Sequence, residues 1–67
     1  MEENWQKVYS SEQEHKVQIV QAVLEDQGIR SIAVNKKDRA YLFGAIELYV
    51  QPEHVIRALQ IINKESL

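Results

Sequence analysis

The sequence contains no cysteine, one proline and two glycines, and each scarcity excludes a class of protein. Without cysteine there is no disulfide and no thiolate metal site, which fits a reducing compartment. Gly28 and Gly44 lie too far apart for a glycine-rich phosphate loop. No apolar run approaches the roughly 20 residues of a membrane span, and the acidic start of the chain differs from a secretory signal. We therefore expect a cytoplasmic protein.

The charge is nearly balanced, with ten acidic residues against eight lysines and arginines and a net charge of −2 at pH 7. This balance gives no electrostatic reason to expect nucleic-acid binding. With 67 residues the chain forms one domain, residues 1–67. At this size folding buries only about 60% of the surface that the unfolded chain exposes. Packing alone must supply the stability, and self-association is one way to add to it.

The first half of the chain predicts a strand followed by a helix. Residues 5–9 alternate large and polar side chains, which is typical of a strand. Ser11 and Glu14 have the spacing of a capping box, in which the Ser11 hydroxyl accepts from the Glu14 amide. A helix over residues 12–27 follows, because its apolar residues fall on one face: Val17, Val20 and Leu24, with Ile19 and Val23 alongside.

Gly28 is predicted to end this helix. If Gly28 adopts the left-handed conformation, Leu24 and Ile29 occupy the two positions that meet hydrophobically in a Schellman motif.

The second half predicts a hairpin and a second helix. Residues 32–34 form a short strand with Ile32 and Val34 facing inward, and the polar residues 35–39 form a turn. A third strand fills most of residues 40–50, with its aliphatic residues at even positions. Gly44 interrupts it, and a bulge there would move the residues before it to the other face. Pro52 suits the first position of a second helix that runs to about Lys64.

All five aromatic residues occupy odd positions in the predicted strands, opposite most of the aliphatic side chains: Trp5, Tyr9, Tyr41, Phe43 and Tyr49. Because side chains alternate between the faces of a strand, this parity predicts an aliphatic face and an aromatic face. Tyr41 and Phe43 share the aromatic face only if Gly44 is not a bulge. Lys7 and Glu47 fall on the same face and can pair across the strands. These seven residues form the candidate interaction surface.

The predicted order βαββα leads to an α+β, ferredoxin-like architecture. A right-handed crossover places strands 1 and 2 parallel, and the hairpin makes strand 3 antiparallel to strand 2. The split βαβ arrangement satisfies both, with strand order 1-3-2 in a three-stranded antiparallel or mixed sheet and both helices on one face. Strand 1 then has an open edge, and the second face of the sheet has no helix to cover it. Such edges and faces invite partners.

No pattern of catalytic or metal-binding residues is present. His15 and His54 open the two helices, which begin at opposite ends of the sheet, so they cannot share a metal ion. Ser10 and Ser11 have no histidine placed to activate them and serve better as caps. We expect no cofactor and no catalytic residue.

A weak basic patch surrounds the predicted hairpin and contains Arg30, Lys36, Lys37 and Arg39. Together with aromatic residues on a sheet face, it suggests the way in which RNA-binding domains stack bases. A solvated turn is the favoured interpretation, because Asp38 interrupts the cluster and the rest of the chain is acidic.

Over nearly its whole length the chain resembles a small bacterial family of unknown function, described as prokaryotic signal-transducing proteins and grouped with PII-like ferredoxin folds. The residues that carry the resemblance are Trp5–Ser10, Val20–Ile29, Ile46–Val50 and Ala58–Leu59. The resemblance implies a regulatory or sensing role. PII proteins bind nucleotides through a long loop after their second strand, and this chain has only a short turn there, so no nucleotide-binding residue is carried over.

We therefore expect a non-enzymatic binding or regulatory module that acts through the open sheet face and the free edge of strand 1. The partner is either an unknown protein or a second copy of the chain, and no membrane is involved. Two alternatives stay open, a sensor domain for a small metabolite or nucleotide and a weak RNA-binding module.

Overall fold

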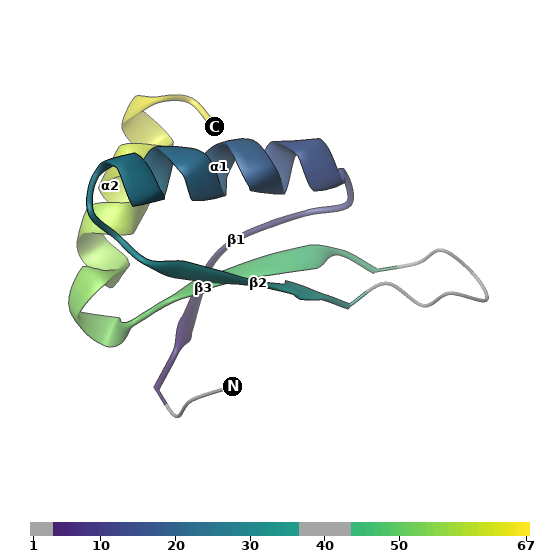
Figure 1. Cartoon of the computed structure of the whole chain (residues 1–67), viewed down its shortest axis with the longest axis horizontal. Coiled ribbons are helices and arrows are strands. Elements are labelled where there is room, and N and C mark those ends of the chain that lie inside the picture. The colour runs from purple at the N-terminus through teal and green to yellow at the C-terminus, as the bar shows by residue number, and fades with distance from the viewer. Residues whose placement is uncertain (1–3, 37–43) are drawn as a thin grey trace.

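The computed structural model describes residues 4–36 and 44–67, and its elements follow the order βαββα (Figure 1). They are β1 (Gln6–Ser11), α1 (Glu14–Asp26), β2 (Ser31–Asn35), β3 (Ile46–Val50), a 3-10 turn (Pro52–His54) and α2 (Val55–Lys64). β3 lies between the other strands and is antiparallel to both, which gives the order β1-β3-β2. The α+β architecture predicted from the sequence is confirmed.

The hydrophobic core lies on one face of this sheet, beneath both helices. β3 alternates buried and partly buried residues, and its buried side chains face α1 and α2. The buried cluster contains Val8, Val17, Val20, Leu24, Ile29, Ile46, Leu48, Val50 and Ala58. Because residues from α1, α2 and β3 share one cluster, both helices cover the same face, and the other face carries no element among the described residues.

The C-terminal end of α1 is the predicted Schellman motif. Gly28 has a positive φ of 82°, and its amide donates to the carbonyl of Glu25. The amide of Ile29 donates to the carbonyl of Leu24 at 2.9 Å, and both side chains are buried. Local sequence signals therefore determine this helix end.

The predicted capping box at the start of α1 is wrong. The Ser11 hydroxyl accepts from the amide of Gln13 at 3.1 Å rather than from Glu14, and the N-cap residue is Gln13. Ser11 itself belongs to β1, where it pairs with Ile46. Strand pairing thus holds Ser11 in the sheet, and the helix begins at Glu14 instead of residue 12.

A bulge in β1 corrects the predicted aromatic face. Lys7 pairs with Tyr49 and Tyr9 pairs with Leu48, so Val8 is an extra residue between them. Directly opposed residues of antiparallel strands share a face, so Tyr9 lies on the face of the buried Leu48. Tyr9 packs against the core cluster, and the prediction that it shares a face with Tyr49 is wrong.

The register of β2 corrects a second prediction. Ile32 pairs with Tyr49 and Val34 with Glu47, whereas Ala33 pairs with the buried Leu48. Ile32 and Val34 therefore lie on the face away from the helices, not inward. The register is set by pairing with β3, whose even positions face the core, and this pairing overrides the hydrophobicity of β2 itself.

β3 begins at Ile46, after Gly44, which has a positive φ of 101°. Tyr41 and Phe43, like most of the predicted turn, lie outside the described residues. The prediction that they share the aromatic face therefore stays a prediction. The regular part of the predicted third strand is confirmed.

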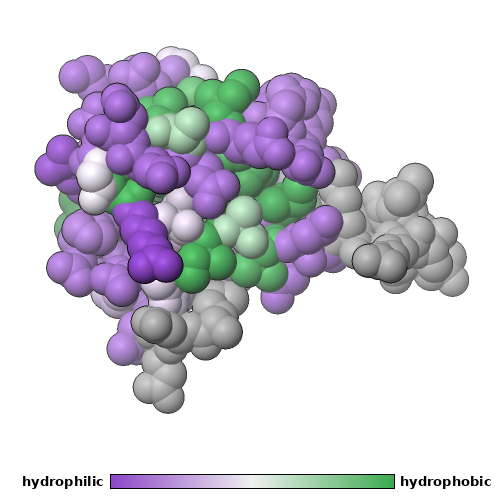
Figure 2. Space-filling view, viewed as in Figure 1, coloured by the Kyte–Doolittle hydropathy of each residue, from purple (hydrophilic) through white to green (hydrophobic). Residues whose placement is uncertain are grey.

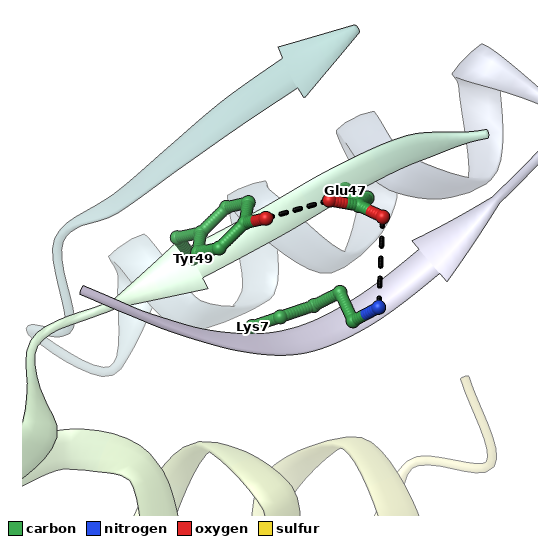
Figure 3. Close-up of polar contacts among 3 residues, drawn as sticks. All are labelled: Lys7, Glu47 and Tyr49. Carbon is green, nitrogen blue, oxygen red and sulfur yellow. Dashed lines mark hydrogen bonds and ion pairs between the residues drawn. The ribbon is translucent and has the colours of Figure 1, made fainter. Parts of the chain in front are cut away.

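The second helical segment begins at Pro52 as predicted, but its first three residues form a 3-10 turn and α2 itself begins at Val55. Its apolar residues are unevenly covered. Ala58 is fully buried, whereas Leu59 and Ile56 are 46% and 73% exposed. Seen from the uncovered side of the sheet, α2 runs alongside β1, beyond the edge that faces away from β3 (Figure 3).

Candidate interaction surface

The uncovered face of the sheet, called the open face below, carries six side chains whose positions follow from the strand register. Residues that oppose Tyr49 and Glu47 share their face, which places β2 and β1 residues beside them. The members are Lys7, Ser10, Ile32, Val34, Glu47 and Tyr49. The two aliphatic residues come from β2, an edge strand, and the polar residues come from β1 and β3. The open face therefore has an apolar half and a polar half.

Three residues of the polar half contact one another (Figure 3). The Tyr49 hydroxyl donates a 2.6 Å hydrogen bond to Oε1 of Glu47, and the Lys7 ammonium lies 3.5 Å from Oε2 of Glu47. The Glu47 side chain is only 20% exposed, whereas that of Lys7 is 52% exposed. Glu47 thus contacts both of the other residues, one through each carboxylate oxygen.

These contacts change the protonation of both groups. The hydrogen bond from Tyr49 lowers the pKa of Glu47, the charge of Lys7 adds to this effect, and burial opposes it. The same hydrogen bond raises the pKa of Tyr49, and burial raises it further. At neutral pH Glu47 is therefore a carboxylate and Tyr49 a neutral phenol. Neither group is tuned toward neutrality, as a general acid or base would be.

The two polar contacts fix the orientation of these three side chains. Lys7 and Glu47 satisfy each other, and Tyr49 presents a ring whose position is fixed by its hydroxyl. A pre-positioned aromatic ring next to aliphatic side chains offers apolar contact area at little entropic cost.

Of the other two predicted members in the described chain, Tyr9 lies on the helix side, whereas the strand register does not assign Trp5 to either face. Trp5 precedes β1 and is partly buried, and its indole N–H is shielded without a hydrogen-bond partner. Tyr9 lines a cleft of about 220 Å³ on the helix side, with Lys16, Ile19, Val20, Ser66 and Leu67. This volume is below the roughly 300–1,000 Å³ of typical ligand sites.

The predicted basic patch is not one cluster in the described residues. Arg30 precedes β2 and Lys36 follows it, so the two exposed side chains stand at opposite ends of that strand. At about 3.3 Å per residue they are separated by about 20 Å. Lys37 and Arg39 lie outside the described residues.

His15 and His54 also stand at opposite ends of the sheet. β1, which precedes α1, ends opposite the start of β3, whereas α2 follows the other end of β3. The described residues contain no group of three or more side chains able to hold a metal ion. Within the same ranges, neither helix has the length and apolar character needed to cross a membrane.

Comparison with known families adds to this geometry. Residues 5–66 match the model of a domain family described as "Putative prokaryotic signal transducing protein". The chain belongs to this family. The match covers every described strand and helix. No curated protein and no solved structure matches the chain.

Sequence reasoning missed Ile32 and Val34 as members of the open face. Their alternation with Ala33 is visible in the sequence, but apolar residues in a strand are normally assigned to the core. One signal could have corrected this: Ala33 is too small to contribute much to a core, whereas the opposing positions of β3 are large.

Proposed function

We propose that this member of the signal-transducing family is a non-catalytic regulatory module that binds another protein through its open face. The observation that supports the proposal most directly is the fixed polar set of Lys7, Glu47 and Tyr49 on a sheet face that the helices leave uncovered. Ile32 and Val34 extend this surface with aliphatic area.

The division of the open face suggests how a partner is selected. A partner that covers Ile32 and Val34 gains from apolar burial, at about 25 cal/mol per Å² before association costs. The partner must also place polar groups over Lys7 and Glu47, because covering a charge without a partner is costly. The polar half therefore favours the correct partner and rejects purely apolar surfaces.

A photo-reactive residue tests the proposal. We would introduce it at Val34 on the open face and, as a matched control, at Glu25 on the exposed side of α1. We expect the reactive residue at position 34 to crosslink to a defined protein and the one at position 25 to give no such crosslink. That protein is then purified, and its binding must weaken with K7E or with Y49A. Crosslinking from both positions, or reconstituted binding that ignores both substitutions, contradicts the proposal.

Homodimerisation is a second form of the same role, and exposed residues of α2 favour it. Leu59 and Ile56 are exposed, lie one turn apart on α2, and belong to the helix that runs alongside β1. In a dimer with a two-fold axis, the Leu59 and Ile56 side chains of each copy would be covered by the other copy, since such an interface is self-complementary. Light scattering over a concentration series tests this form, and a strict monomer at high micromolar concentration contradicts it.

A further inference from the structure

The outer edge of β2 differs from that of β1 in being regular. All five residues of β2 keep one register with β3, whereas β1 is interrupted by the bulge at Val8. β2 carries no charge and no proline between Ser31 and Asn35. Natural edge strands are usually protected by bulges, charges or proline, and β2 has none of these within its length.

Backbone geometry shows which groups of β2 point outward. The amide of Lys36 donates to the carbonyl of Ala45 at 3.0 Å, so the even-numbered residues form the hydrogen-bonded pairs with β3. The N–H and C=O groups of Ala33, an odd-numbered residue, therefore point away from β3. The Ser31 carbonyl also points outward, and the Gln21 side-chain amide donates to it at 3.3 Å. A side chain of α1 thus supplies the hydrogen bond that a neighbouring strand would provide.

A groove follows this edge on the helix side. It has a volume of about 270 Å³ and lies between α1 and β2, with Gln18 and Gln21 on one wall and Ala33 on the other. The small, exposed side chain of Ala33 leaves room for the side chains of an added strand. Figure 2 shows apolar surface over β2, with polar surface next to it at either end.

The charges at the two ends of β2 indicate what kind of strand fits. Arg30 and Lys36 are exposed and flank the uncharged strand. A second copy fits poorly, because a symmetric antiparallel pair centred on Ala33 sets Arg30 opposite the partner's Lys36, and like charges across strands repel. A strand with an acidic residue at each end meets both cations favourably.

We propose that the outer edge of β2, with the groove beside α1, binds an extended peptide segment that has an uncharged β-strand centre and an acidic residue at each end. Binding adds the segment to the sheet as a fourth strand next to β2. This site is separate from the open face and does not depend on the function proposed for it.

A synthetic seven-residue peptide tests this site. Its centre alternates valine and threonine, an aspartate stands at each end, and both termini are blocked. A control peptide has lysine at both ends. In an NMR titration of the full chain, we expect the aspartate peptide to shift the Ala33 amide and to slow its hydrogen exchange. At low salt, the lysine peptide should bind about ten-fold more weakly.

Three variants distinguish strand addition from other ways in which the peptide could bind. In R30E/K36E the charge preference should reverse, so that the lysine peptide binds better. A33P should fold, since its lost N–H points outward, but should not bind, whereas I32P should unfold because the Ile32 amide bonds to β3.

Equal binding of both peptides, or shifts at β1 rather than at Ala33, would overturn the proposal. So would a concentration-dependent dimer in which the Ala33 amide becomes protected, because that result would assign the edge to a second copy.

Discussion

Tyr49 donates its hydroxyl to Glu47, two residues earlier on the same strand, at 2.6 Å. Both residues belong to β3, so the contact forms as soon as that strand is extended and needs no distant segment. It orients both the ring and the carboxylate on the open face. Lys7 then approaches the other carboxylate oxygen from β1. The pair therefore offers a direct way to measure whether the open face is ordered in solution.

Glu47→Gln should lower the pKa of Tyr49 toward the ordinary tyrosine value of about 10, because the acceptor that raises it loses its charge. A pH titration of the Tyr49 ring by NMR measures this. Lys7→Gln is the control, since Lys7 does not contact the phenol and should leave its pKa nearly unchanged. An unchanged Tyr49 pKa in Glu47→Gln would show that the hydrogen bond is absent in solution.

The stability lost in Tyr49→Phe should depend on pH in two windows. The folded-state pKa of Glu47 is lowered, so its contribution is present above its unfolded pKa of about 4.3 and disappears as pH falls through the folded value. The pKa of Tyr49 is raised, so its contribution is present below about pH 10 and disappears as pH rises through the folded value. Urea denaturation of wild type and variant should give a constant gap between about pH 5 and 9. A gap that persists at pH 2 would contradict this reading.

Tyr9→Ala should destabilise the protein by about 2 kcal/mol, because Tyr9 packs against the core rather than lying on the open face. Urea denaturation measures the loss. Nuclear Overhauser effects should connect the Tyr9 ring with methyl groups of Val20 and Leu67, which line the same cleft. Contacts with the side chain of Glu47 instead would show that the β1 bulge does not form, because without it Tyr9 would oppose Glu47.

Ser66→Gly should stabilise the protein by about 1 kcal/mol. Ser66 has a φ of 57°, and the amides of Ser66 and Leu67 donate to the carbonyls of Asn63 and Ile62, which makes Ser66 the left-handed residue of a second Schellman motif. Glycine adopts this conformation without strain. Thermal unfolding should show an increase of about 4–8 °C.

Gly28→Ala provides the opposite change at the end of α1. No neighbouring atom lies within 4 Å of an added Cβ, so the loss, again about 1 kcal/mol, comes from backbone strain alone. Equal stability of Gly28→Ala and wild type would contradict the left-handed conformation.

Leu59→Gln together with Ile56→Gln should abolish any self-association that uses α2, while leaving the fold intact because both side chains are exposed. Sedimentation equilibrium measures the assembly state. Arg57→Ala is the control, because this exposed residue lies at least about 100° around the helix from both Ile56 and Leu59. Dimers that survive the double substitution would place the interface elsewhere.

The sequence predicts features that depend on neighbours within one turn or one strand. The stop of α1 at Gly28 and the 3-10 turn that opens at Pro52 ahead of α2 are of this kind, because a left-handed glycine and a helix-opening proline act locally. The parity of Lys7 and Glu47 also predicted their ion pair, but not the hydrogen bond from Tyr49. Each of these features needs no knowledge of a distant partner strand.

The features that sequence reasoning placed wrongly depend on pairing between strands. Val8 looks regular within β1, and only its alignment with β3 shows that it is an extra residue. The hydrophobicity of Ile32 and Val34 predicts that they face the core, and only their pairing with Tyr49 and Glu47 places them on the open face. The predicted capping box at Ser11 is wrong for the same reason, because Ser11 pairs with Ile46 of β3. Register is a long-range property, and a one-residue shift reverses every face downstream.

The bulge at Val8 also gives the protein two spectroscopic reporters that respond to different events. Because of it, Tyr9 and Tyr49 stand on opposite sides of the same thin sheet. Ring resonances of Tyr9 will follow unfolding and repacking beneath the helices, whereas those of Tyr49 will follow occupation of the opposite surface. Binding and loss of structure can thus be distinguished in one experiment on the unmodified chain.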